Sequence, residues 1–191
     1  MAESDHRLMH RCREGDDAAF EEFVRRWESR VAGILGRLTA NGVVPPPADV
    51  DDMSQEVFLR VLSGCRRYRD HYQFSTWLYQ IVLNVARDSA RRQRRRQKTL
   101  YNQRPLQQST PPVESAARKE LQREISTALS ALPSQAREPL VLRHYGDLTF
   151  AEVAEVLGLP VSTVKSRVQS ALLKLRAELR QRGIDHRELE S

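Results

Sequence analysis

Short polar side chains recur along one face of a helical pattern near the C-terminal end of the chain. Its hydroxyl and amide members are Ser162, Ser166, Gln169 and Ser170, and the cations beside them are Lys165 and Arg167. Hydroxyl and amide groups can hydrogen-bond to base edges at close approach, while lysine and arginine reach phosphates. The pattern therefore favours a helix that reads duplex DNA. The alternative is an ordinary amphipathic hairpin with a solvated charged face.

Two helices joined by a short turn are needed to present that face. Thr149 and Glu152 predict a capping box at the start of a first helix with apolar residues at helical spacing. Gly158 suits the end of that helix, because glycine readily adopts a left-handed conformation, and Pro160 begins the second helix. The apolar stripe of the second helix is predicted to contain Val164, Val168, Ala171, Leu172, Leu175 and Leu179. Residues 148–179 therefore predict a helix-turn-helix.

Tyrosines alternate with cations in a second stretch, SGCRRYRDHYQFS, residues 63–75. Aromatic rings stack on unpaired bases and guanidinium groups hold phosphates, so this composition is typical of single-strand binding. The alternative is a loop whose tyrosines pack on the domain. In the helix predicted next, residues 76–92, Asn84 and Arg87 lie off the inward face. That inward face is predicted to contain Trp77, Leu78, Ile81, Val82, Val85 and Ala86.

An acidic face marks a helix predicted from Asp49 onward, DVDDMSQEVFLRVL. It follows a long predicted helix, residues 16–38, and the helix-breaking segment NGVVPPP, residues 41–47. The outward residues of the acidic helix are Asp52, Gln55, Glu56 and Arg60. They fit either an ordinary helix start, where the helix dipole favours carboxylates, or a docking surface for a basic partner.

Six cations in eight positions form the run RRQRRRQK, residues 91–98. Such a run is typical of a solvated, disordered tail unless a polyanion orders it. Residues 99–115 contain prolines and glutamines without a sustained apolar pattern, which predicts a flexible linker. Helices are predicted over 121–132 and 134–145, and Pro139 predicts a late start or a kink in the latter.

The composition bounds the fold and the class of partner. With 191 residues, 8 Gly, 9 Pro and little apolar/polar alternation, the chain predicts an all-α protein of two domains, residues 1–98 and 116–191. A formal net charge of +6 suits a polyanion, either nucleic acid or an anionic membrane. No apolar run approaches the roughly 18 residues of a membrane span, and the N-terminus has no apolar signal core. We therefore expect an intracellular, cytoplasmic protein.

Catalytic and metal-binding patterns do not emerge from the sequence. It contains no H-E-x-x-H pair, no Gly-rich phosphate loop and no convincing Ser/His/Asp set. His10 and Cys12 supply only half of a zinc site, and Cys12 and Cys65, which form no C-x-x-C pair, are expected to be reduced thiols. We expect no enzymatic activity, cofactor, metal or small-molecule substrate.

Three motifs in order give the chain a resemblance to the extracytoplasmic-function (ECF) sigma factors of bacterial RNA polymerase. DVDDMSQEVFLRVL resembles the family's D-x-x-Q-E-x-F helix, and FSTWLYQIVLNVARDSARR resembles its F-x-T-W-L-Y-x-I-x-x-N-x-x-x-D-x-x-R signature. LPSQAREPLVLRHYGDLTFAEVAEVLGLPVSTVKSRVQSALLKLR resembles its promoter-binding C-terminal domain. The resemblance covers nearly the whole chain.

The resemblance implies two DNA contacts, a polymerase contact and a protein regulator. It implies docking on core RNA polymerase by Asp52, Gln55 and Glu56. Recognition and melting of the −10 promoter element is implied for Tyr68, Tyr72, Phe74, Trp77, Asn84, Arg91 and Arg92. Reading of the −35 element in duplex DNA is implied for Ser162, Thr163, Lys165, Ser166, Arg167, Gln169 and Ser170. The family also implies an anti-sigma factor as a partner.

Some residues depart from the family pattern, and two other functions fit parts of the chain. Gln80 stands where arginine is frequent, and Gln169 and Ser170 stand where histidine or arginine is common, which affects the promoter bases read. A stand-alone helix-turn-helix regulator that binds operator DNA would explain residues 148–179 alone. An adaptor would use the acidic helix for a protein partner and RRQRRRQK for localisation on nucleic acid.

Overall fold

The computed structural model describes residues 3–68, 73–100, 125, 127–129 and 131–182. In this part of the chain the regular elements are all helical, which confirms the all-α prediction. They are α1 (Asp5–Arg13), α2 (Asp17–Ala40), α3 (Val50–Gly64), the short 3₁₀ helix η1 (Cys65–Arg67), α4 (Phe74–Leu100), α6 (Ser134–Tyr145), α7 (Phe150–Leu157) and α8 (Val161–Gln181). None of the described helices has both the length and the apolar character needed to cross a membrane.

Side-chain caps begin the N-terminal helices. Asp16 accepts a hydrogen bond from the Ala19 amide at 3.1 Å, and Asp49 accepts one from the Asp51 amide at 2.9 Å. Such caps satisfy amides that have no partner inside the helix. α1 was not predicted from the sequence. Its signals were present, since Ser4 caps it and its buried residues Leu8, Met9 and Cys12 keep helical spacing.

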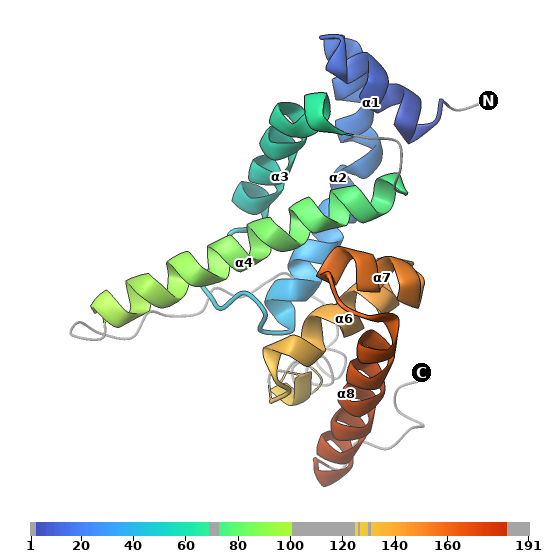
Figure 1. Ribbon diagram of the computed structural model, residues 1–191. Coiled ribbons are helices and arrows are strands. Elements are labelled where there is room, and N and C mark those ends of the chain that lie inside the picture. The colour runs from blue at the N-terminus through green and yellow to red at the C-terminus, as the bar shows by residue number, and fades with distance from the viewer. Residues whose placement is uncertain (1–2, 69–72, 101–124, 126, 130, 183–191) are drawn as a thin grey trace, which may run out of the picture.

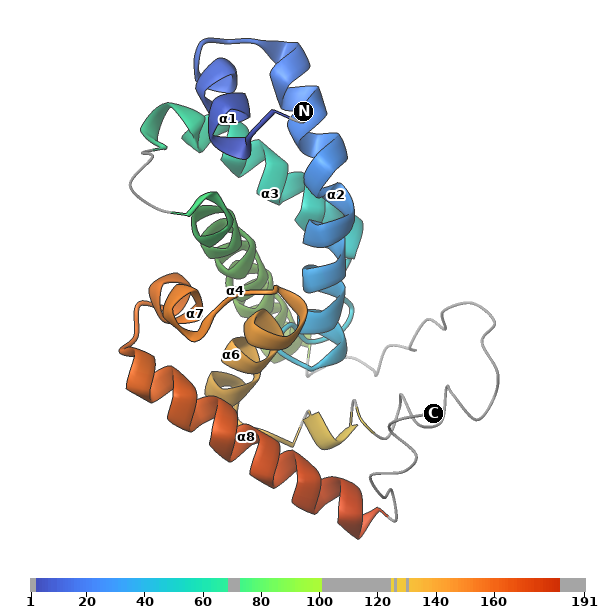
Figure 2. The ribbon, with the colours of Figure 1, turned by 90° about the vertical axis from the view of Figure 1, so that its right-hand side faces the viewer.

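α2 is the central element of the N-terminal half, because α1, α3, α4 and α6 all pack on it (Figures 1 and 2). Its buried side chains recur at helical spacing and are Phe23, Trp27, Val31, Ile34, Leu35 and Leu38. They belong to a single cluster of buried apolar residues that also includes Val57 of α3, Leu78 of α4 and Val153 of α7. The core therefore extends from the first helices of the chain into the C-terminal half.

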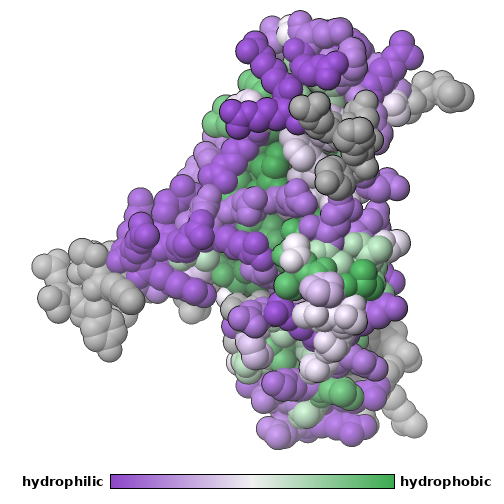
Figure 3. Space-filling model, in the orientation of Figure 1, coloured by the Kyte–Doolittle hydropathy of each residue, from purple (hydrophilic) through white to green (hydrophobic). Residues whose placement is uncertain are grey.

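The basic run 91–98 lies within α4, so the expectation of a disordered tail does not hold. The side chains of Gln93 and Gln97 donate hydrogen bonds to the carbonyls of Pro47 and Pro46, which ties this part of α4 to the loop after α2. The end of α4 projects from the body of the molecule, and the face visible in Figure 3 is strongly hydrophilic there. The exposed cations are Arg91, Arg92, Arg94, Arg95 and Arg96.

The C-terminal helices follow the predicted order. α6 begins at Ser134, so the predicted late start is wrong, and Pro139 lies inside the helix, where its ring nitrogen has no hydrogen to give to the Gln135 carbonyl. α6 packs on α2 and α8, and α7 packs on α4 (Figure 2). Thr99 and Leu100 end α4, while the rest of the predicted linker lies outside the described residues. The domain bounds stay a prediction.

Candidate nucleic-acid interface

The predicted helix-turn-helix is formed by α7 and α8. The Thr149 hydroxyl accepts from the Glu152 amide at 3.2 Å, and the Glu152 carboxylate accepts from the Thr149 amide at 2.7 Å, which is the predicted capping box. Gly158 ends α7 with φ 65° and ψ 38°, the left-handed conformation that glycine adopts without a Cβ clash. The turn to α8 contains only Gly158, Leu159 and Pro160.

The polar face of α8 is turned to solvent as predicted. Ser162, Lys165, Ser166, Gln169 and Ser170 are exposed, and Thr163 and Arg167 are partly exposed. The opposite face buries Val164, Val168, Ala171 and Leu179. Leu172 was predicted to belong to this buried stripe, which is wrong, because its side chain is 50% exposed. It lies at the margin of the buried stripe.

Local contacts orient some of the side chains on this face. The Lys165 ammonium lies 6.0 Å from the centre of the Phe150 ring of α7, a cation–π contact that directs it across the turn. The Ser166 hydroxyl donates to the Thr163 carbonyl at 3.0 Å. A contact from Ser166 to a base would therefore require its hydroxyl to rotate or to accept a hydrogen bond. Gln169 and Ser170 are the exposed side chains best suited to reading base edges.

The aromatic residues around the start of α4 form a packed group. Tyr68 and Phe74 are only 7% and 4% exposed, and the ring centres of Tyr68 and Trp77 are 4.8 Å apart. The Tyr68 hydroxyl lies 2.6 Å from Nδ1 of His6 in α1. This arrangement matches the alternative in which the tyrosine packs on the domain. Tyr72 lies outside the described residues.

Asn84 and Trp77 differ from these buried rings in their access to solvent. Asn84 is exposed on α4, and Trp77 is partly exposed. Arg91 and Arg92 are exposed further along the same helix. The structure therefore places five of the residues predicted to contact the −10 element on α4, four of them open to solvent, while the fifth, Phe74, is buried at the start of the helix against Tyr68.

A chain of ion pairs that the sequence analysis missed connects α3 to α4. Arg60 lies 2.8 Å from Glu56 and 2.9 Å from Asp88, and Asp88 also pairs with Arg91. Burial alone would raise the pKa of Asp88, but hydrogen bonds from Arg60 and Arg91 outweigh it and lower that pKa. The spacing of Glu56 and Arg60 within α3 could have suggested the first pair. The pairing with Asp88 depends on how α3 and α4 pack.

The acidic face of α3 is open to solvent. Asp52 and Gln55 are exposed and Glu56 is partly exposed. Leu59 continues this face one turn later, and its side chain is 62% exposed. Residues three, four and seven positions apart share a helical face. The surface of α3 therefore combines the carboxylates of Asp52 and Glu56 with the apolar side chain of Leu59. Leu59 was not among the residues predicted to belong to this face.

Of the residues considered for a metal site, the two cysteines lie close together in the core, whereas His10 is exposed. Cys12 and Cys65 are both buried free thiols, and the Cys65 thiol lies 3.8 Å from the Cys12 carbonyl oxygen. His10 is exposed, with Nδ1 3.3 Å from Glu14. Within the described part of the chain, no three His, Cys, Asp or Glu residues group as metal ligands.

Two parts of the chain match known protein families. Residues 23–96 match the family described as "Sigma-70 region 2", and residues 122–175 match the one described as "Sigma-70, region 4". An ECF RNA polymerase sigma-E factor of Haemophilus influenzae is 29% identical over 88% of this chain and 92% of its own length. An RNA polymerase sigma-H factor of Pseudomonas aeruginosa is 26% identical over 87% of this chain and 89% of its own length.

Solved structures agree with these matches. CnrH, in complex with the cytosolic domain of CnrY, is 28% identical with a TM-score of 0.68, covering 94% of this chain and 99% of that chain. The sigma factor RpoE of Bartonella quintana, in complex with the anti-sigma factor NepR, shares the fold at 17% identity and a TM-score of 0.62, over 84% of this chain and 98% of that one. The two family matches, in order along one all-α chain and supported by full-length relatives, identify it as a member of the sigma-70 family of RNA polymerase sigma factors, within the ECF group.

Proposed function

We propose that this sigma factor binds promoter DNA at two separate places, with α8 on the duplex −35 element and α4 on the −10 element. The observation that carries the proposal is the presence of two exposed polar helix faces, one around Gln169 and one around Asn84, on a single chain. A stand-alone operator-binding protein needs only the first face. The match of residues 23–96 to sigma-70 region 2 therefore favours promoter recognition over that alternative.

At the −35 element, we assign phosphate contacts to the cations and base contacts to the short polar side chains. Lys165 and Arg167 carry the charge that phosphates attract, whereas Gln169 and Ser170 have the reach and hydrogen-bonding groups for base edges. Ser162, Thr163 and Ser166 lie at the start of the same helix. Amides at a helix N-terminus also favour phosphate.

At the −10 element, we assign direct contacts to Trp77, Asn84, Arg91 and Arg92. An exposed amide can read the edge of an unpaired base, and an aromatic ring can stack on its face. Tyr68 and Phe74 would have to leave the aromatic group to contact a base, so their first role is to hold the N-terminal end of α4. Tyr72 remains a predicted contact on sequence grounds.

Polymerase and regulator contacts complete the proposal. The face of Asp52, Gln55, Glu56 and Leu59 would dock on a basic and partly apolar surface of core RNA polymerase. An anti-sigma factor is proposed as a partner because NepR is described as one in the RpoE complex. The chain would work in the cytoplasm, where the polymerase acts, and would supply no catalytic groups of its own.

The test is run-off transcription with purified bacterial core RNA polymerase and a library of promoter sequences. The full chain should stimulate initiation from a subset that shares two short elements at fixed spacing. Asn84→Ala and Gln169→Ala should each reduce initiation and alter preference at different elements. Absence of stimulation by the unmodified chain from any sequence would overturn the proposal.

A further inference from the structure

A histidine of α1 reaches the aromatic group at the start of α4. The Tyr68 hydroxyl oxygen lies 2.6 Å from Nδ1 of His6, which is hydrogen-bond distance. The centre of the His6 ring also lies 5.8 Å from that of Tyr68 and 6.4 Å from that of Phe74. α1 precedes residue 23, where the match to sigma-70 region 2 begins, so that match assigns this contact no role.

The start of α1 is fastened to α2 beside His6. The carboxylate of Asp5 accepts hydrogen bonds from Arg26 Nη1 at 2.9 Å and from Trp27 Nε1 at 3.2 Å. Hydrogen bonds to an ionised carboxylate are stronger than those between neutral groups, and α1 packs along α2. His6 therefore extends from a helix whose position is fixed by the domain.

Tyr68 is held through its backbone, its ring and its hydroxyl. Its amide donates to the Cys65 carbonyl at 3.2 Å, at the end of η1. Its ring centre lies 4.8 Å from that of Trp77 and 5.7 Å from that of Phe74, separations at which aromatic pairs attract one another. The hydrogen bond to His6 adds a directional contact, so the Tyr68 ring is fixed in one orientation.

Trp77 is the member of this group that also meets solvent. It is partly exposed, whereas Tyr68 and Phe74 are buried. The Tyr68 ring lies closer to it than the Phe74 ring, 4.8 Å against 5.8 Å between centres. A Cβ on Gly64 would meet the Trp77 ring at 3.5 Å, so the end of α3 borders the indole as well. The orientation of the indole therefore depends on how its inner neighbours are held.

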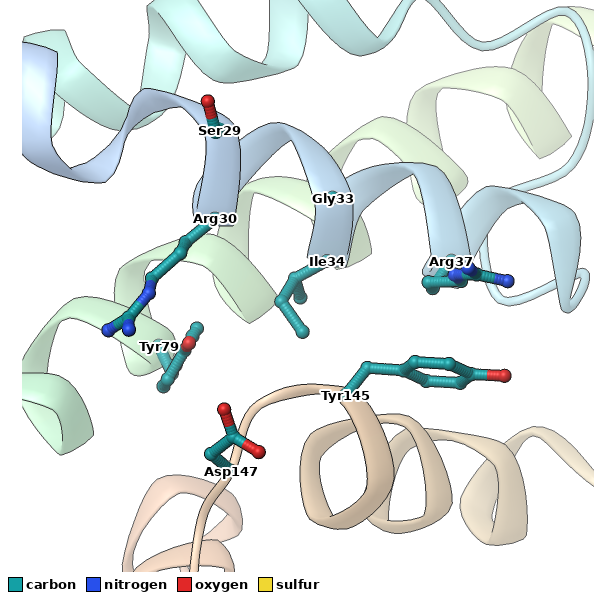
Figure 4. Close-up of a pocket in the computed structure, with 8 residues that line it drawn as sticks. All are labelled: Ser29, Arg30, Gly33, Ile34, Arg37, Tyr79, Tyr145 and Asp147. Carbon is teal, nitrogen blue, oxygen red and sulfur yellow. The ribbon is translucent and has the colours of Figure 1, made fainter.

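The other end of the aromatic group borders a cavity. The Trp27 ring lies 5.5 Å from Phe74 and 6.4 Å from Tyr79. Tyr79 lines an open cavity of about 240 Å³ between α2 and the connection from α6 to α7 (Figure 4). Among the described residues, the ring contacts of Trp77 are with the opposite end of the group. Tyr79 is therefore a buried tyrosine whose hydroxyl can serve as a control.

From this geometry we propose that His6 is a positioning residue of the −10 contact, which holds Tyr68 so that Trp77 presents its indole to an unpaired base in one orientation. The proposal rests on the promoter-binding function above and adds a residue of α1 to the recognition of the −10 element. His6 acts through Tyr68 and makes no DNA contact in this arrangement. A side chain already held in its binding orientation loses less conformational freedom when the base arrives.

Paired substitutions separate the hydrogen bond from the packing of the rings. His6→Phe keeps a ring and removes the polar atom. His6→Asn keeps a polar atom, because the amide oxygen and nitrogen of asparagine are bonded to Cγ, as Nδ1 is in histidine. Tyr68→Phe removes the hydroxyl alone. Two controls make the same changes elsewhere, His10→Phe at an exposed position of α1 and Tyr79→Phe at the cavity end of the group.

The first measurement is run-off transcription with core RNA polymerase on single-base variants of one promoter selected from the library. His6→Phe and Tyr68→Phe should each weaken discrimination at one or two positions of the −10 element by about 2- to 10-fold, the range expected for one hydrogen bond. Preference within the −35 element should not change. The combined variant should lose no more than either single variant, because both remove the same contact. His6→Asn should retain most of the discrimination, and both controls all of it.

The second measurement reports the indole directly and needs no DNA. The chain contains two tryptophans, so a Trp27→Phe background leaves Trp77 as the source of tryptophan emission. In that background, His6→Phe and Tyr68→Phe should increase quenching by acrylamide, because the indole is held less firmly against the group. The two controls should not increase it. Circular dichroism and urea unfolding check that each variant is folded.

Three results would overturn the positioning role. Unchanged −10 discrimination in both His6→Phe and Tyr68→Phe would make the contact structural only, even if stability falls. Equal losses in His6→Asn and His6→Phe would show that the hydrogen bond is not the cause, and equal losses at the −10 and −35 elements would indicate a general defect. Failure of the unmodified chain to initiate would count against the proposed function instead, and acrylamide quenching would still test whether His6 holds Trp77.

Discussion

At the scale of single residues, exposure separates side chains that are accessible to a ligand from those that hold the fold. Gln169 and Asn84 are exposed polar groups with room for a base, whereas Tyr68 and Phe74, which looked equally suited by composition, are buried. Alternation of tyrosine with arginine does not distinguish a stacking surface from packed rings. Burial decides it, because a ring already packed between neighbours must lose those contacts before it stacks on a base.

Lys165→Ala and Gln169→Ala should weaken DNA binding in different ways. Loss of a phosphate contact at Lys165 should reduce affinity across sequences and flatten its salt dependence, because fewer counterions are released. Loss of a base contact at Gln169 should cost about 1 to 3 kcal/mol at one or two base pairs. Binding to single-base variants of a selected −35 element at several salt concentrations measures both. Equal losses for Gln169→Ala on every sequence would contradict base reading.

Cys12 should make stability depend on pH in the alkaline range. Burial, with a smaller contribution from the neighbouring Cys65, raises the pKa of the Cys12 thiol from 9.0 to about 11. The folded chain therefore favours the neutral thiol, and this contribution is complete below about pH 9 and is lost as the pH rises towards 11. In urea unfolding, the difference in stability between the native chain and Cys12→Ala should shrink across that window. A constant difference would contradict the shift.

At the scale of elements, helix ends and turns determine how each polar face is presented. The capping box at Thr149 and the left-handed Gly158 begin and end α7 within a few residues, so α8 leaves the turn in one direction. α4 shows the opposite case, where a helix continues through a run of arginines because Gln93 and Gln97 fasten it to the loop after α2. The arginines of this run are distributed around α4 and point into water. Their mutual repulsion therefore does not unwind the helix while the two glutamines hold it to the loop.

Gly158→Ala should destabilise the chain, while Gly36→Ala should not. A Cβ at Gly158 meets no atom within 4 Å, but φ is +65°, and the left-handed conformation costs a residue with a side chain roughly 1 to 2 kcal/mol. A Cβ at Gly36 in α2 also meets nothing within 4 Å, and in a regular helix alanine should stabilise by about 0.5 to 1 kcal/mol. Chemical denaturation of both variants measures the contrast. Equal effects would contradict the backbone explanation.

At the scale of the whole molecule, the N-terminal and C-terminal halves share one core. Apolar residues of α2, α4 and α7 belong to a single buried cluster, the Arg87–Glu138 ion pair joins α4 to α6, and Arg137 donates to the Asn41 carbonyl at the end of α2. Two domains joined by a linker would have been expected to move independently. The packing instead predicts that the free chain unfolds as one cooperative body.

Thermal unfolding of the free chain should therefore occur in one transition. Shared burial couples the halves, so the calorimetric and van't Hoff enthalpies should agree, as they do for a cooperative unit. The Glu138→Gln variant should broaden or split this transition, whereas Glu21→Gln, the same charge change at an exposed position of α2, should not. Two separate transitions in the unmodified chain at neutral pH would contradict the shared core.

The local sequence pattern was sufficient to predict much of the fold and part of the candidate site. Apolar spacing and capping residues predicted α2, α3, α7 and α8 and the exposed face around Gln169, because these depend on neighbours within a few residues. α1 carried the same signals and was missed. Pro139 was expected to delay or kink its helix, and the delayed start is wrong, because α6 begins at Ser134 and contains Pro139 in its interior.

The sequence alone determined most of the helices, the polar face of α8, the acidic face of α3 and the resemblance to the family, while α1 was missed. Only the tertiary structure decided that Tyr68 and Phe74 are buried, that Arg60 pairs with Asp88, and that Arg87 and Arg137 fasten the C-terminal half onto α4 and α2. The physical reason is the distance along the sequence between the residues that interact. Caps and helical faces arise from residues a few positions apart, whereas the burial of a ring and the partner of a charge depend on residues that folding brings together from distant parts of the chain.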